Sequence, residues 1–483
     1  MGKSILDLEP GILWKRFKEL CDIPRCSGRE GKVVSYLTSL AKNAGLKYKW
    51  DKKGNVVISV PASPGFEKSP VVVLQSHVDM VCEKNSDKDH DFSKDPIEPV
   101  INGEWVGANG TSLGADNGIG AAAALALIDS KEIKHGPLEL LFTVDEETGL
   151  NGAAELQPDF IKGKILLNLD SEDEGKFVVG CAGGEKLQIN LPVQRQSAGC
   201  KTFIEVSVYG LKGGHSGMDI STGRGNANQI LARILLSLNN DFVISEFEGG
   251  TKHNAIPRES RAIICTCPED EERIKTGLKK EFESVLSEYG KIETDAVLSI
   301  TDANAETEPL TKDSSKKLLN LIIALPHGVF SMSHEIKDLV QTSDNLAIIR
   351  LLADSAEIIT SVRSSVPTEL SCLVKKIESV SDLAGAETIH LSGYPAWTPN
   401  LDSGLLKIMQ QIHKEVTGRE AEIFVIHAGL ECGIIGDKFS GMEMISFGPE
   451  IQNPHSPDER VHIESVSRFW KLLTYTLNRL ASG

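Results

Sequence analysis

Histidine and acidic side chains recur at the ends of apolar runs in the first third of the chain. The first pair, His77 and Asp79, follows the β-branched run 71–75. Residues two apart on an extended chain face the same side. A neutral imidazole can bind a divalent metal through one nitrogen while a carboxylate holds the other N–H. Because a surface pair at the end of a strand would look the same, this motif indicates a metal site only together with others.

Asp116 lies in a glycine-rich turn, between Gly114 and Gly118, directly before the alanine-rich segment 121–128 that predicts a helix. Glycine lets the backbone approach other groups closely. A carboxylate on such a turn can offer one oxygen to each of two metals. The alternative is an aspartate that only caps the helix.

The acidic triplet 145–147 ends the apolar run 138–144, and Asp170 ends the run 165–169. Like charges repel when crowded unless a cation compensates them. Neighbouring side chains of an extended segment point in different directions, so one carboxylate can bind a metal while the next acts as a general base. The triplet could also be an exposed acidic turn. Since parallel strands converge at the carboxyl edge of an open α/β sheet, the four motifs together predict one shared metal site.

Composition narrows the class of protein. A chain of 483 residues predicts two or three domains, and a net charge of −17 argues against nucleic acid or an anionic membrane as partner. The nine cysteines, scattered from Cys21 to Cys432 without the paired spacing of a zinc site, resemble reduced thiols, so no disulfide framework is expected. We find no signal segment in residues 1–14 and no run long enough to span a bilayer. A cytoplasmic enzyme is therefore expected.

Periodicity predicts two kinds of architecture. Residues 10–190 alternate helical and strand patterns, which is an α/β layout. The composition turns polar at 194–199, and the following segments predict a strand, a helix, two strands, a helix and a strand: 203–209, 226–238, near 242, 262–267, 270–289 and near 300. A loosely similar order between 314 and 392 leaves two similar halves open, although no repeat of individual residues is visible.

The carboxyl-terminal part returns to the α/β pattern. It predicts two helices and two strands, at 404–416, 423–427, 444–447 and 465–480. We therefore predict a discontinuous catalytic domain, residues 1–195 and 395–483, with a mixed sheet. Residues 196–394 would form an inserted α+β lid domain.

Six separated motifs carry a family resemblance: SHVDMVCEKN, GADNGIG, DEETGL, GCAGGE, HAGLECG and NPHSPDE. They are similar to those of the cytosolic aminoacyl-histidine dipeptidases, also called Xaa-His dipeptidases or peptidase D. That family lies in the co-catalytic zinc exopeptidase clan that includes carboxypeptidase G and aminoacylase. The resemblance runs over essentially the whole chain, with the motifs in the family's order.

The resemblance implies two divalent metal ions, zinc by default, with manganese or cobalt as alternatives. It implies that Asp116 bridges the two metals and is followed by a cis peptide bond. It also implies Glu146 as the general base and Asp79 as the residue that orients His77. The implied metal ligands are His77, Asp116, Glu147, Asp170 and His455.

Further candidates lie in the inserted segment. The resemblance implies that His215, in the sequence Gly-Gly-His-Ser-Gly, stabilises the tetrahedral oxyanion, from its own or a neighbouring subunit. Asn254 and Arg363 are candidates to hold the carboxylate of a dipeptide, because one offers an amide donor and the other a bidentate fork. A structural turn histidine, a loop amide and a surface charge are the alternatives. His427 and Glu431 could also face the site, or Glu431 could be a surface acid.

We therefore predict a metallo-dipeptidase that hydrolyses Xaa-His and related small peptides. A tripeptidase or an N-acyl amino acid amidohydrolase of the same clan would share every metal ligand and stays open. A third hypothesis is a metal-binding scaffold without catalysis. The presence of Glu146 beside Glu147 argues against it. The resemblance suggests a homodimer, although a duplicated lid could mimic a partner and leave the chain monomeric.

Overall fold

The computed structural model describes residues 4–197, 199, 202–238 and 241–483, so Ala198 of the polar stretch 194–199 lies outside it. Its contacts form two compact units. Unit 1 comprises Met1–Cys181, Pro399–Val425 and Leu430–Gly483, and unit 2 comprises Ala182–Thr398 and Ile426–Gly429. The contacts thus change unit at 181/182, before the polar stretch. It stays a prediction that residues 1–195 and 395–483 fold as one domain and residues 196–394 as another.

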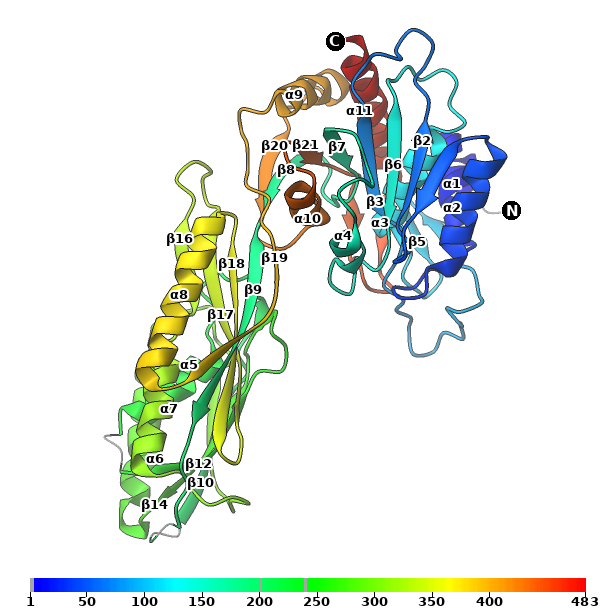
Figure 1. Cartoon of the computed structure of the whole chain (residues 1–483). Helices are drawn as coiled ribbons and strands as arrows, with labels where there is room; N and C mark the ends of the chain where they lie inside the picture. The colour runs from blue at the N-terminus through cyan, green and yellow to red at the C-terminus, as the bar shows by residue number, and fades with distance from the viewer. Residues whose placement is uncertain (1–3, 198, 200–201, 239–240) are drawn as a thin grey trace. The chain divides into compact units, whose positions relative to one another are not determined.

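Unit 1 is built on an eight-stranded mixed sheet of order β1-β2-β6-β3-β7-β21-β8-β20 (Figure 1). β3 (Val72–His77) lies parallel between β6 (Leu138–Thr143) and β7 (Ile165–Asn168), and β7 is parallel to β21 (Glu443–Ser446). The outer strands are β1 (Lys47–Trp50), β2 (Val56–Val60), β8 (Lys176–Cys181) and β20 (Glu422–Ile426). Every residue of β3 and β6 is buried, as their continuous apolar runs predict. The ends of β3, β6 and β7 therefore bring their polar residues to one edge.

Helices cover this sheet. They are α1 (Gly11–Cys21), α2 (Gly31–Asn43), α3 (Ala115–Ala126), α4 (Asn151–Glu155), α9 (Gly404–Thr417), α10 (Glu431–Lys438) and α11 (Ile463–Ser482). α3 packs on β3 and against α1, and all of its residues are buried. Its alanines leave room for that close approach. Among the described residues, no helix combines the length and the apolar character that crossing a membrane requires.

A small second sheet in unit 1 corrects the expectation that all four motifs follow strands of a single sheet. Its order is β22-β23-β5-β4, with β22 (Ile451–Gln452), β23 (Arg460–His462), β5 (Trp105–Ala108) and β4 (Pro99–Asn102). β5, the strand before Asp116, belongs to this sheet and not to the main one. Asp116 therefore does not end a strand of the main sheet: it is the second residue of α3. The pairing of β23 with β5 carries the carboxyl-terminal motif to this part of the unit.

Unit 2 is a nine-stranded sheet covered by α5 (Ala227–Leu236), α6 (Glu271–Ser287), α7 (Lys312–Ala324) and α8 (Pro367–Ala384) (Figure 1). The main path of the sheet is β15-β10-β14-β12-β17-β18-β9-β19, and β16 (Gly328–Met332) pairs with β17 beside it. The strands of that path are β9 (Gly183–Pro192), β10 (Thr202–Tyr209), β12 (Val243–Gly249), β14 (Ser260–Thr266), β15 (Val297–Asp302), β17 (Val340–Leu351), β18 (Ser355–Ser364) and β19 (Glu387–Tyr394). A shared apolar core joins the sheet to the helices.

The strand order of unit 2 repeats. The half β15-β10-β14-β12 and the half β19-β9-β18-β17 are arranged alike and meet where β12 pairs with β17. Counted along the chain, the first of the four strands in each half lies between the fourth and the third. The first strand of the second half is β9, which precedes the whole first half in the chain. The repeat is hard to see in the sequence because one copy is inserted into the other.

A disulfide joins Cys26 to Cys82, which are 56 positions apart in sequence and have their Cα atoms 5.6 Å apart. The expectation that the cysteines form no disulfide is therefore wrong for this pair. The two residues come from separate loops, and a β-bridge between Cys26 and Met80 places those loops side by side. Sequence spacing alone cannot show such a pairing, because it depends on tertiary contacts.

Replacing both Cys26 and Cys82 by serine is expected to lower the free energy of unfolding by about 4 kcal/mol, from the entropy that a cross-link across a loop of this size removes from the unfolded chain. Urea unfolding of oxidised protein measures the change. Cys372→Ser, at an exposed cysteine, is the matched control and should have no effect. An unfolding free energy that is unchanged in the double variant would contradict the disulfide.

Candidate active site

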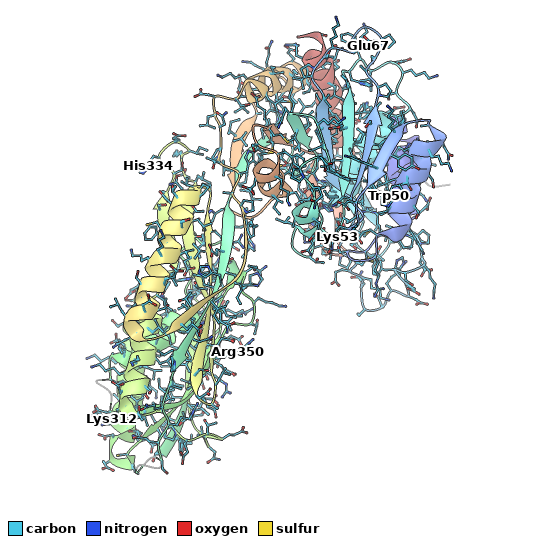
Figure 2. All side chains as sticks on the ribbon, viewed as in Figure 1. Trp50, Lys53, Glu67, Lys312, His334 and Arg350 are labelled. Atoms are coloured by element: carbon cyan, nitrogen blue, oxygen red, sulfur yellow. A yellow bond between two sulfur atoms is a disulfide. The ribbon has the colours of Figure 1, made fainter. Side chains whose placement is uncertain are left out.

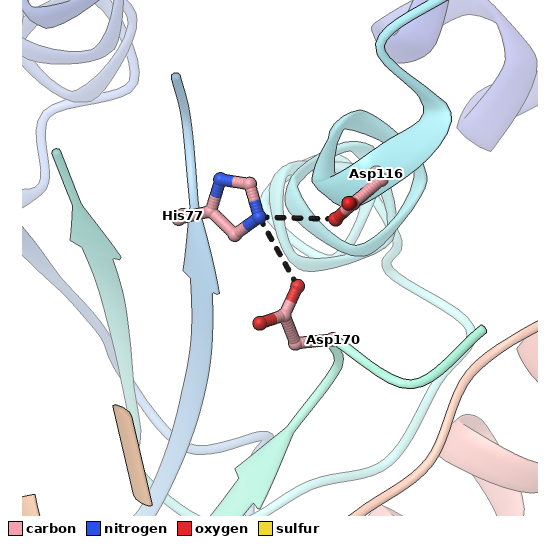
Figure 3. Close-up of side chains that lie close together, drawn as sticks. All are labelled: His77, Asp116 and Asp170. Atoms are coloured by element: carbon pink, nitrogen blue, oxygen red, sulfur yellow. Dashed lines mark hydrogen bonds and ion pairs between the residues drawn. The ribbon is translucent and has the colours of Figure 1, made fainter. Parts of the chain in front are cut away.

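Two histidines and three carboxylates converge at the carboxyl edge of the main sheet. The Nε2 atom of His77 lies 3.0 Å from Oδ1 of Asp116 and 3.2 Å from Oδ1 of Asp170 (Figure 3). The Nε2 atom of His455 lies 3.2 Å from Oδ2 of Asp116 and 2.9 Å from Oε2 of Glu147. Each oxygen of Asp116 therefore faces a different histidine.

These side chains form overlapping groups that could each hold a metal ion. The ligand atoms of His77, Asp116 and Asp170 lie within 4.8 Å of one another, and so do those of Asp116, Glu147 and His455. A third group of the same size combines His77 with Glu146 and Glu147. The structure thus brings together all five residues expected as ligands, with Asp116 common to two groups. The peptide bond after Asp116 is cis, which confirms that expectation.

The cluster fits divalent cations. Within the part of the chain that the structure describes, Asp116, Asp170 and Glu147 form ion pairs only with His77 and His455. Buried carboxylates need such compensation. Oε1 of Glu147 is buried and has no hydrogen-bond partner among the residues that the structure describes. Imidazole and carboxylate together suit zinc, and manganese or cobalt can use the same ligands.

The carboxylates of the cluster favour positive charge on both histidines. Hydrogen bonds to Asp116 and Glu147 raise the pKa of His455 to about 11. Burial opposes a charge on His77, yet Asp170 and Asp116 raise its pKa well above the usual value. The cluster therefore favours positive charge at the positions of both rings.

Asp79 connects the first motif to the acidic triplet. Its Oδ1 lies 3.4 Å from Nδ1 of His77 and accepts a hydrogen bond from the N–H of Glu146 at 3.1 Å. Its Oδ2 accepts hydrogen bonds from the N–H of Glu147 at 3.2 Å and from the hydroxyl of Ser27 at 2.8 Å. Burial works to raise the pKa of Asp79, but His77 and these donors lower it to about 2. Asp79 thus stays ionised and fixes two motifs at once.

The three acids of the triplet have different surroundings. Asp145 forms an ion pair with Lys53, labelled in Figure 2, with Oδ2 and Nζ 2.6 Å apart, and accepts a hydrogen bond from Thr148. It anchors the turn to the loop between β1 and β2, a role that the sequence did not reveal. Glu146 has no ion pair among the described residues, and burial followed by Asp170 and Glu431 raises its pKa well above the usual value. Glu147 lies in the cluster with His455.

Glu431 is not a surface acid: it is fully buried at the start of α10. Its Oε2 accepts hydrogen bonds from Gln75 and from Thr143, both at 2.6 Å, and burial raises its pKa to about 8. Gln75 and Thr143 belong to β3 and β6, so Glu431 contacts two of the strands that carry the cluster. The sequence could not decide this, because the partners of Glu431 lie 356 and 288 residues away along the chain.

His215 of unit 2 has a defined tautomer. Its Nδ1 accepts hydrogen bonds from the N–H groups of Gly217 at 3.2 Å and Met218 at 3.1 Å. Burial and, after it, the charge of Arg363 lower the pKa of His215, which favours the neutral ring. The single proton of that ring must then be on Nε2. His215 therefore offers one N–H donor.

Arg363 and Asn254 meet at Ser216. Arg363 donates to the hydroxyl of Tyr394 at 2.8 Å and to that of Ser216 at 3.3 Å, while the carbonyl of Asn254 accepts the N–H of Ser216 at 2.9 Å. The structure thus gathers the three candidates of unit 2 around Ser216. Ser216 and Tyr394 were not predicted, since neither stands in a spacing that indicates chemistry. His427 also belongs to unit 2, where its Nε2 lies 2.7 Å from the Ser343 hydroxyl.

Comparison with known proteins decides the family. The model of the peptidase family M20/M25/M40 matches residues 73–479. The chain belongs to this family. It is therefore a peptide-bond hydrolase, and the family resemblance that its motifs carry is confirmed.

Relatives of this M20 peptidase match it over its whole length. The cytosol non-specific dipeptidase of Escherichia coli is 40% identical over 99% of both chains. The crystal structure of the aminoacylhistidine dipeptidase from Vibrio alginolyticus is 41% identical, covers 99% of this chain and 98% of its own, and has a TM-score of 0.91. The expected mixed α/β peptidase fold is thereby confirmed. A tripeptidase from Staphylococcus aureus, 17% identical with a TM-score of 0.56 over 99% of this chain and 100% of its own, shares the fold.

Proposed function

We propose that this M20 peptidase is a two-metal dipeptidase that hydrolyses Xaa-His and related dipeptides. The observation that carries the mechanism is the position of Asp116, whose two oxygens face two separate histidines 3.0 and 3.2 Å away. That geometry is what a carboxylate shared by two cations requires. The whole-length similarity to two proteins named as dipeptidases supports the substrate class.

One cation would be held by His77, Asp116 and Asp170, and the other by Asp116, Glu147 and His455. When bound, the two cations supply Lewis acidity, which polarises the scissile carbonyl and makes a water molecule more acidic. Glu146 accepts the proton of the attacking water and then delivers it to the leaving amine. Two bound cations would lower the pKa of Glu146 and so would favour the ionised carboxylate that a general base needs. Asp79 keeps the His77 ring in place.

Unit 2 contributes substrate contacts in this proposal. The Nε2–H group of His215 donates to the oxygen that becomes negative in the tetrahedral intermediate. Arg363 and Asn254 hold the carboxylate of the dipeptide. Arg363 is almost fully buried, and its Nε has no hydrogen-bond partner among the described residues. Asn254 is exposed.

Replacing His215 by alanine is expected to lower kcat by about 10²–10³-fold with a smaller change in KM, because an oxyanion donor acts mainly in the transition state. Steady-state kinetics measure both constants. Met218→Ala, in the same turn and 51% exposed, is the matched control and should leave kcat unchanged. Equal kcat values in wild type and His215→Ala would exclude this role.

The substrate class is tested with purified protein loaded with zinc, manganese or cobalt. The panel contains β-alanyl-histidine, other dipeptides, a tripeptide and an acetylated amino acid. We expect cleavage of the dipeptides. Cleavage of the acetylated amino acid alone would make the protein an amidohydrolase, preference for the tripeptide a tripeptidase, and metal binding without any hydrolysis a scaffold.

The proposal includes a cytoplasmic location and a homodimer. Light scattering on protein eluted from a size-exclusion column gives the mass in solution. A mass of one chain would instead favour a monomer in which the two halves of unit 2 replace a partner.

A further inference from the structure

Glu459 has no part in the mechanism above, although it lies four residues after His455. Its side chain is buried, with 3% of the residue exposed. Oε2 accepts hydrogen bonds from the N–H groups of Leu113 at 2.7 Å and Gly114 at 2.8 Å. Oε1 accepts those of Ala115 at 2.7 Å and Asp116 at 3.2 Å. Four consecutive amides thus converge on one carboxylate.

The amides of Leu113 and Gly114 precede α3, and those of Ala115 and Asp116 are the first two of that helix. Asp116 and Asn117 depart from helical φ/ψ, so these four amides lie ahead of the regular turns of α3. Buried backbone N–H groups need acceptors, and each oxygen of a carboxylate can accept two of them. Gly114, the residue before α3, has no side chain that could cap it. Glu459 supplies the missing acceptor from a segment 343 residues further along the chain. One of the four amides is that of Asp116 itself.

Arg25 holds the carbonyl side of the same loop. It is 1% exposed, and its guanidinium donates to the carbonyl of Gly114 and, at 3.1 Å each, to the carbonyls of Val78 and Asp79. Arg25 therefore joins the loop after His77 to the loop before Asp116. Arg25 and Glu459, a buried cation and a buried anion, thus both bind peptide groups beside the proposed metal ligands His77 and Asp116.

Two glycines of the motif make room for this arrangement. A Cβ atom at Gly114 would lie 2.4 Å from Nη2 of Arg25, and one at Gly118 would lie 2.7 Å from it. Gly114 also has a φ of +67°, which disfavours other residues. The glycines around Asp116 thus serve the approach of Arg25 as well as the turn.

We propose that Glu459 is a positioning residue for Asp116 and that it acts together with Arg25. Glu459 touches no reacting atom: it fixes the backbone from which the shared carboxylate extends. The inference rests on the proposed two-metal function. Because Asp116 is common to both ligand groups, a shift of its backbone weakens both cation sites together, while the other ligands stay unchanged.

The test replaces Glu459 by glutamine, which removes the charge and turns an NH₂ group toward two backbone N–H groups. We expect zinc affinity at both sites to fall about 10–100-fold, as for other residues that support metal ligands. At limiting zinc kcat should fall while KM changes little, and excess zinc should restore part of the activity. Arg25→Lys, which loses the fork, should show the same pattern.

Glu139→Gln is the matched control. Glu139 lies at the amino end of β6, away from the cluster, and its Oε2 also accepts two backbone N–H groups, from Lys162 at 2.7 Å and Gly163 at 3.0 Å. This variant should lose stability but keep wild-type zinc affinity. Equal zinc affinities in Glu459→Gln and Glu139→Gln would overturn the inference.

Two further outcomes are separated by the design. If Glu459→Gln does not fold, Glu459→Asp keeps the charge with a shorter reach, and its zinc affinity is compared with that of Glu139→Asp in the same way. If wild-type protein binds two zinc ions but cleaves no peptide, the proposed function fails. The inference about Glu459 is still decided in that case, because its readout is zinc affinity.

Discussion

Replacing Glu146 by glutamine is expected to lower kcat by about 10²–10⁴-fold while both metal ions stay bound. Glutamine keeps the shape of the side chain but cannot accept the proton of the attacking water. Steady-state kinetics on a dipeptide, with metal content measured on the same sample, test both statements. The expectation is specific to Glu146, since its side chain has no ion pair among the described residues whereas Glu147 pairs with His455.

Glu147→Gln is the matched control for this prediction, because it makes the same chemical change one residue away. It should lower metal affinity. Near wild-type turnover in Glu146→Gln would show that another group is the base. Loss of metal from Glu146→Gln would instead support the third ligand group, in which His77, Glu146 and Glu147 lie together.

Removing the shared carboxylate is expected to have the largest effect. Asp116→Ala should lose both cations and lower activity about 10⁴-fold or more, because cation catalysis contributes several kcal/mol and each 1.4 kcal/mol is a factor of ten. Metal content and kcat measure this directly. Asp173→Asn, an exposed acid three residues after Asp170, is the control and should change neither. Retention of one full equivalent of metal in Asp116→Ala would show that the two sites do not share this ligand.

The sequence by itself determined the local half of the site. The segments 72–77, 138–143 and 165–168 form strands because each is short, mostly apolar in its first part and long enough to be buried within a sheet. These strands deliver His77, the triplet 145–147 and Asp170 to one edge. Apolar periodicity and terminal acids are short-range signals. Motif order added the family, and with it the expected pairing of roles in Glu146 and Glu147.

Only the tertiary structure decided the rest. His455 and Asp116 are 339 residues apart in sequence, and their contact depends on the pairing of β23 with β5. The disulfide of Cys26 and the burial of Glu431 likewise depend on which loops and helices pack together in the folded chain. Glu459 looks like any acid near the end of a chain, but four consecutive amides of the distant segment 113–116 donate hydrogen bonds to it. Such contacts leave no local pattern, because the partner of a buried polar group is set by packing over the whole unit.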